Sequence, residues 1–131
     1  MARICCLAAL DTTDVPLLAA ALKGAGEPGL TIIADLEVAE LSKLGPDVLV
    51  ADIDRLAVDP LEMLRQLRFV LPDCVIVVYT AIAEPSWSRA CHLAGASCLL
   101  SKESRESQLI SGLQGAIRTG CFTDPRFAAV G

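Results

Sequence analysis

Several motifs and residue classes are missing from this sequence of 131 residues, and each absence removes a class of function. There is no Cys-x-x-Cys pair, which argues against a zinc site and against thioredoxin-like redox chemistry. There is no Gly-x-x-x-x-Gly-Lys, and the Gly-x-Gly-x-x-Gly at 24–29 follows a segment of helical period instead of a strand, so a nucleotide-binding enzyme is poorly supported. Acidic residues outnumber basic ones, and the net charge is −5. Because nucleic-acid phosphates need a basic face, we expect no direct nucleic-acid partner.

The sequence also lacks a long apolar segment. Its longest apolar run, from Cys74 to Ala83, is too short to span a bilayer. The run near the N-terminus is interrupted at Asp11 and lacks the cleavage site of a signal peptide. We therefore expect no membrane partner and a cytoplasmic protein.

Cysteine is present but is not spaced like a disulfide framework. The six cysteines are Cys5, Cys6, Cys74, Cys91, Cys98 and Cys121. Three of them, Cys5, Cys6 and Cys74, lie inside apolar runs. Free cysteine is among the most buried residue types, so this placement favours buried, reduced thiols in a cytosolic protein.

Apolar runs alternate with segments of helical period along the chain. The runs predict strands over 3–9, 31–34, 47–52, 74–80 and 98–101. The periodic segments predict helices over 14–25, 36–44, 60–71, 85–94 and 105–118. The third helix has the clearest start, because Asp59 suits the N-cap, Pro60 the first position, and Glu62 a capping box.

Strands that are apolar on both faces belong in a parallel sheet covered on both sides by helices. With right-handed crossovers, five such strands give a flavodoxin-like, doubly wound (βα)5 α/β fold with strand order 2-1-3-4-5. We expect one domain over 1–119, followed at 120–131 by a tail or the start of a linker.

Ligands of an open parallel sheet bind beyond the carboxyl ends of its strands. Asp52 ends the third predicted strand, Thr80 ends the fourth, and Lys102 follows the fifth. A carboxylate can act as a nucleophile toward a phosphoryl group, while a hydroxyl and an ammonium can hold the phosphoryl oxygens. The three residues therefore predict a phosphoryl-capturing site.

Three segments resemble response-regulator receiver domains: PDVLVADIDRLAVD, VVYTA and GASCLLSKE. The resemblance covers about residues 3–120 and is strongest to receivers that precede helix-turn-helix output domains. It implies a bacterial two-component phosphorelay protein that is not an enzyme, with Asp52 at the phosphoacceptor position and Thr80 and Lys102 at the phosphoryl-binding positions. It also implies a protein partner: a histidine kinase, an output domain or another regulator.

The sequence departs from the receiver pattern at two places. Ala8 and Ala9 stand where receivers carry the acidic pair that binds magnesium, and Leu99 stands at the aromatic switch position. Magnesium needs several hard oxygen ligands, which alanine cannot supply. We therefore expect an atypical receiver that acts as an interaction module without cofactor or ordinary magnesium-dependent phosphorylation. A single standing conformation is expected, with homodimerisation through helix faces that include Trp87 and His92.

Two alternatives remain open at this point. One is a functional phospho-receiver in which Asp11 or Asp54 assists metal binding in place of the acidic pair. The other is a flavodoxin-like electron carrier. The loop after the first predicted strand, Leu-Asp-Thr-Thr-Asp, disfavours the electron carrier because it has no glycine and two carboxylates that would repel phosphate.

Overall fold

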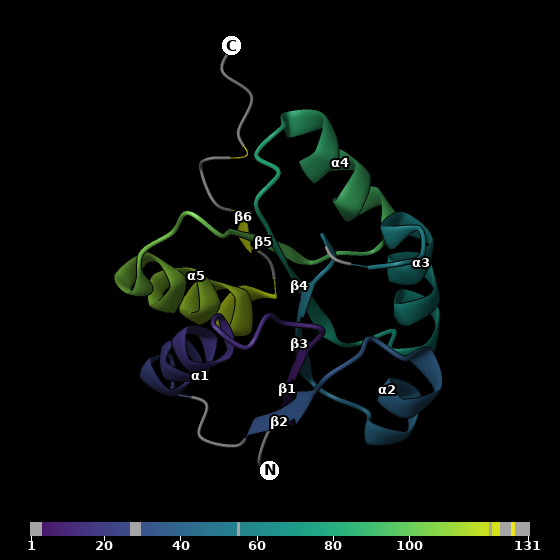
Figure 1. The fold of residues 1–131 in the computed structure, drawn as a ribbon, viewed down its shortest axis with the longest axis horizontal. Coiled ribbons are helices and arrows are strands. Elements are labelled where there is room, and N and C mark those ends of the chain that lie inside the picture. Colours follow the sequence, from purple (N-terminus) through teal and green to yellow (C-terminus); the bar gives the residue numbers. More distant parts are fainter. Residues whose placement is uncertain (1–3, 27–29, 55, 121, 124–126, 128–131) are drawn as a thin grey trace.

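A parallel sheet runs through the middle of the molecule (Figure 1). The computed structural model describes residues 4–26, 30–54, 56–120, 122–123 and 127. The strands are β1 Cys5–Ala8, β2 Leu30–Ile33, β3 Val48–Asp52, β4 Val75–Thr80, β5 Cys98–Ser101 and β6 Phe122–Thr123. Every neighbouring pair is parallel, in the order β2-β1-β3-β4-β5-β6. The predicted order 2-1-3-4-5 is therefore confirmed.

The sixth strand was not foreseen. Residues 122 and 123 pair with Cys98 and Leu99, whereas the sequence placed them in a tail. A strand of two residues is too short to produce an alternating or apolar pattern, so the sequence carries no signal for it. The predictions for Arg3, Cys121 and most of the proposed tail lie outside the described residues.

Helices cover both faces of the sheet (Figure 1). On one face lie α1 Val15–Gly24 and α5 Glu106–Thr119, and on the other α2 Val38–Leu44, α3 Pro60–Val70 and α4 Pro85–Ala94. Two core clusters result, because successive strand side chains point to opposite faces. Leu7 packs in the cluster with α1 and α5, while the next residue, Ala8, packs in the cluster with α2, α3 and α4.

The start of α3 follows the predicted signal only in part. Asp59 Oδ1 accepts hydrogen bonds from the backbone N–H groups of Leu61 (3.0 Å) and Glu62 (3.5 Å), so it is the N-cap. The prediction of a capping box is wrong, however. The Glu62 carboxylate pairs with Arg65 at 3.2 Å, because an (i, i+3) partner on the helix surface competes for it.

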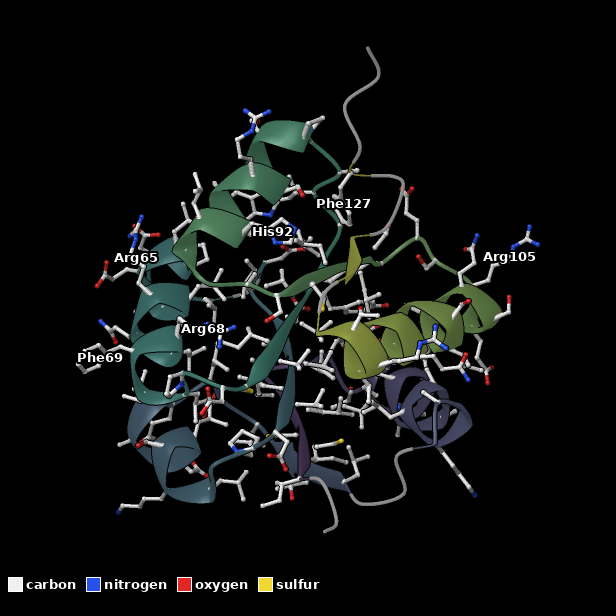
Figure 2. All side chains as sticks on the ribbon, turned by 180° about the vertical axis from the view of Figure 1, so that it is seen from behind. Arg65, Arg68, Phe69, His92, Arg105 and Phe127 are labelled. Atoms are coloured by element: carbon white, nitrogen blue, oxygen red, sulfur yellow. The ribbon has the colours of Figure 1, made fainter. Side chains whose placement is uncertain are left out.

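Arg68 joins α3 to the chain that follows α3 and α4 (Figure 2). Its guanidinium donates to the carbonyls of Leu71, Pro72, Cys74 and Gly95 and to the Ser97 hydroxyl, at distances from 2.8 to 3.1 Å. Gly95 has a φ of 122°, and a Cβ there would lie 2.6 Å from Arg68 Cβ. Only glycine therefore fits beside this arginine without displacing it.

The prediction of buried thiols is confirmed for the five cysteines that the structure describes, all of which are buried. Burial, the largest cause in each case, raises the pKa of Cys6 to about 11 and those of Cys74 and Cys91 to about 12. These thiols are therefore protonated at neutral pH. In the described part of the chain, no helix is both long enough and apolar enough to cross a membrane.

Candidate functional site

The carboxyl ends of β3, β4 and β5 bring the predicted site residues together. Asp52 and Thr80 are completely buried, and the Lys102 side chain is 22% exposed. Lys102 Nζ lies 2.7 Å from Asp52 Oδ2, so these two residues form an ion pair. The Lys102 backbone N–H also donates to the Thr80 carbonyl (3.0 Å), which fixes the loop after β5 against the end of β4.

Asp54 completes the site in a way that the sequence did not predict. Thr80 Oγ1 donates to Asp54 Oδ1 at 2.6 Å, and the Ala81 backbone N–H donates to Oδ2 at 2.8 Å. Lys102 Nζ lies 3.2 Å from the same Oδ2. Thr80 therefore reaches the Asp52–Lys102 pair through Asp54. The available signal was the Asp-x-Asp spacing, which brings two carboxylates within reach of one lysine.

The charges of the site balance only in part. Asp52 Oδ1 accepts from the Asp54 backbone N–H at 2.9 Å, and the Lys102 ammonium, 2.7 Å away, is the partner of Oδ2. Burial by itself lowers the pKa of Lys102, but hydrogen bonds and charge attraction from both aspartates outweigh it. The pKa of Lys102 is therefore raised above its usual value. The lysine stays charged and holds two carboxylates.

The alanines at the acidic-pair positions give a magnesium ion nothing to bind. Ala8 is fully buried in the core, and Ala9, with a φ of 59°, borders a cavity of about 490 Å³ between the loops after β1, β2 and β3. Asp11 Oδ1 accepts from the Thr13 backbone N–H at 3.1 Å. Among the described residues, no group of three or more His, Cys, Asp or Glu side chains is placed to hold a metal. The described residues at this edge of the sheet do not fit magnesium, which needs several oxygen ligands.

The remaining predicted positions lie away from this site. Leu99 is completely buried in the core on the side of α2, α3 and α4. Trp87 is half-buried against the same core, and His92 Nδ1 donates to the Ala96 carbonyl at 3.0 Å. The prominent exposed apolar side chains are instead Phe69 (87%) and Leu93 (83%). The sequence contained a signal for the exposure of Phe69, because this residue lies outside the apolar face of its helix.

Comparison with known proteins gives one sequence relative and many related folds. No protein-family model matches the chain. It is 29% identical over 85 residues to the methanol utilization control regulatory protein MoxX of Paracoccus denitrificans. That match covers 63% of this chain and 38% of the relative, so this chain corresponds to well under half of that protein.

The solved structures decide the fold. The isolated REC domain of RcsB from Salmonella enterica serovar Typhimurium, in the presence of the phosphomimetic BeF3−, matches with a TM-score of 0.79 and 16% identity. The match covers 97% of this chain and 96% of that one.

The chain has the fold of a response-regulator receiver domain.

A LuxR-family two-component response regulator from an Aurantimonas species has the same receiver fold, with a TM-score of 0.78 and 18% identity. That match covers 97% of this chain and 93% of the other. The resemblance to receivers drawn from the sequence is thus confirmed at the level of fold. Within this fold, Asp52, Thr80 and Lys102 occupy the strand ends at which the sequence placed them.

Proposed function

We propose that this chain is an atypical receiver of a bacterial two-component system. In this proposal it is a cytoplasmic interaction module, not an enzyme, that binds a protein partner without ordinary magnesium-dependent phosphorylation of Asp52. The observation that carries the proposal is the closed network of Asp52, Asp54, Thr80 and Lys102, which is held together by its own charges and hydrogen bonds.

The site offers poor support for the alternative of a metal-assisted phospho-receiver. That alternative needs a free carboxylate from Asp11 or Asp54 near the acidic-pair positions. Both oxygens of Asp54 accept from groups on β4 and the loop after it, and Asp11 accepts from its own turn. Moving either carboxylate to a metal would break these contacts without supplying the missing pair at Ala8 and Ala9.

The presence of leucine at position 99 favours a single conformation over a switch between two. A switch needs an element with two discrete arrangements and a ligand that favours one of them. Leu99 is completely buried, and its short aliphatic side chain has no second, solvent-facing place comparable to that of an aromatic ring. We therefore assign partner binding to a fixed surface. The partner class is a histidine kinase, an output domain or another regulator.

The test is phosphodonor labelling followed by intact mass analysis. Wild type and Asp52→Asn are incubated with acetyl phosphate and magnesium, and neither is expected to gain a phosphoryl adduct. A matched variant, Ala9→Asp, places a carboxylate beside the cavity at a backbone conformation that aspartate tolerates. This variant is expected to gain magnesium binding, measured by isothermal titration calorimetry. An adduct that forms in wild type and is lost in Asp52→Asn would refute the proposal.

We also propose that the module forms a symmetric dimer through helix faces, the default arrangement of small homo-oligomers. The exposed Phe69 and Leu93 are better candidates for this contact than Trp87 and His92, which are half-buried. Light scattering of wild type against Phe69→Ser and Leu93→Ser tests this. Unchanged mass in both variants would remove these side chains from the interface.

A further inference from the structure

The Asp54 carboxylate is held by three donors of different kinds. A hydroxyl, a backbone N–H and an ammonium, from Thr80, Ala81 and Lys102, lie 2.6, 2.8 and 3.2 Å from its oxygens. They come from two separate segments of the chain, and Asp54 from a third. Preorganised donors of these kinds, converging from several directions, are what a protein uses to hold the oxygens of a phosphoryl group or another oxyanion.

We propose that Asp54 is an internal anion that occupies the oxyanion-binding donors of this site in place of an external phosphoryl group or phosphate ion. The inference rests on the proposed function only in identifying Thr80 and Lys102 as phosphoryl-binding positions. The distances themselves do not depend on any partner.

The backbone around Asp54 keeps its carboxylate in place. The Asp54 N–H donates to Asp52 Oδ1 at 2.9 Å, which fixes the turn that follows β3. On the other side, the Ile82 N–H donates to Thr80 Oγ1 at 3.1 Å, so that hydroxyl accepts one hydrogen bond while it donates another to Asp54. The carboxylate thereby ties the loop after β4 to the loop after β3.

The charge of the site adds a second barrier to an external oxyanion. Two carboxylates, Asp52 and Asp54, share one ammonium, so the cluster carries a net negative charge. A phosphate ion would have to displace Asp54 and also approach that charge. With Asp54 removed, Lys102 balances Asp52 and the three donors become available. The site is open enough for exchange, because the side chains of Asp54 and Lys102 are 16% and 22% exposed.

A simpler role for Asp54 would be to neutralise the buried lysine. In that case the three contacts have no relation to oxyanion binding, and removing the carboxylate would leave a site that water fills. The two interpretations differ in whether phosphate binds after Asp54 is removed, and at which atoms.

The experiment is a titration with inorganic phosphate followed by ¹H–¹⁵N NMR, with the Ala81 amide as the reporter. Wild type, Asp54→Ala and Asp54→Asn are compared with Asp11→Asn, which removes one negative charge from the same edge of the sheet without releasing the donors. We expect saturable shifts at Ala81 in Asp54→Ala, with an affinity at least about tenfold above that of wild type or Asp11→Asn. Adding Lys102→Met to Asp54→Ala should abolish them.

Equal phosphate affinity in Asp54→Ala and Asp11→Asn would overturn the inference, because the gain would then come from net charge alone. If Asp54→Ala does not fold, the neutral Asp54→Asn variant and amide hydrogen exchange in wild type carry the test. The Ala81 amide is expected to be protected in wild type, and exchange at the rate of an open loop would count against the inference. Phosphodonor labelling of wild type would refute the proposed function but leave the phosphate comparison valid.

Discussion

Replacing Arg68 with alanine is expected to destabilise the fold far more than replacing Arg65, which lies on the outer face of the same helix, α3. Figure 2 shows Arg68 pointing inward from α3, whereas Arg65 and Phe69, on the same helix, point outward. The Arg68 guanidinium donates to four backbone carbonyls and to the Ser97 hydroxyl, which itself accepts from the Ile76 N–H of β4 at 3.2 Å. The arginine thus connects α3, the end of α4 and the start of β4.

The magnitude follows from what the alanine variant would leave behind. Each hydrogen bond from a charged donor contributes about 1.5–3 kcal/mol net, but bonds that share one side chain are not additive. Water can reach some of the freed carbonyls, because Leu71, Pro72 and Cys74 line a small surface cavity. We therefore expect a loss of about 3 kcal/mol in the free energy of unfolding, which is a fall of about 10 °C in Tm for a domain of this size.

The assay is urea unfolding followed by Trp87 fluorescence and circular dichroism. Arg65→Ala is the matched control, because Arg65 is 57% exposed and makes one surface ion pair with Glu62. Its loss should cost no more than about 0.5 kcal/mol. Arg68→Lys should also lose most of the stabilisation that Arg68 provides, since one ammonium cannot reach all the carbonyls that a planar guanidinium reaches together. A loss below about 1 kcal/mol in Arg68→Ala would refute the reasoning.

Three further outcomes follow from the same structure. Asp59→Ala should cost about 1 kcal/mol of unfolding free energy through loss of the α3 N-cap, measured by urea unfolding, whereas Glu62→Ala should cost less because it completes no capping box. The five described cysteines should react with a thiol reagent at neutral pH only after denaturant is added, and fast labelling of the native protein would contradict their burial. Stability should fall in alkali, because folding raises the pKa values of several groups. Each such group stabilises the fold fully below its pKa in the unfolded chain, and this stabilisation is lost as the pH rises through its pKa in the folded protein. For Cys6, Cys74 and Cys91 the free energy of unfolding should begin to fall above about pH 9, by about 1.4 kcal/mol per pH unit for each thiol, and should go on falling toward pH 11 to 12. Lys102 adds to this fall above about pH 10.5. A Tm that stays flat between pH 8 and 11 would count against this prediction.

The order and type of the main elements could be predicted from the sequence because two-sided burial leaves strong local signals. A run such as Val48–Asp52 is apolar on both faces only if helices cover the sheet on both sides. Once the sheet was parallel, the rule for strand ends was enough to bring Asp52 and Lys102 to the same edge. Neither step needed information about distant side-chain contacts.

The features that were missed depend on such distant contacts. Asp54 turns toward Thr80 and Lys102 because donors from two other segments meet there. The Asp-x-Asp spacing indicates a second carboxylate at this strand end but does not indicate which donors it binds. Arg68 occupies a position in its helix at which an exposed side chain is equally compatible with the pattern. Two of its acceptors, the Gly95 carbonyl and the Ser97 hydroxyl, lie 27 and 29 residues later in the chain.

The short strand β6 has a consequence for the open border of the sheet. Its two residues pair with Cys98 and Leu99, so they satisfy backbone groups of β5 that would otherwise face outward. A chain shortened to residue 119 would lose this cover and present a bare, apolar strand edge, which is a template for adding a strand from another molecule. Oligomers of the shortened chain would then form by pairing between sheets, with no relation to any helix-mediated dimer of the longer one.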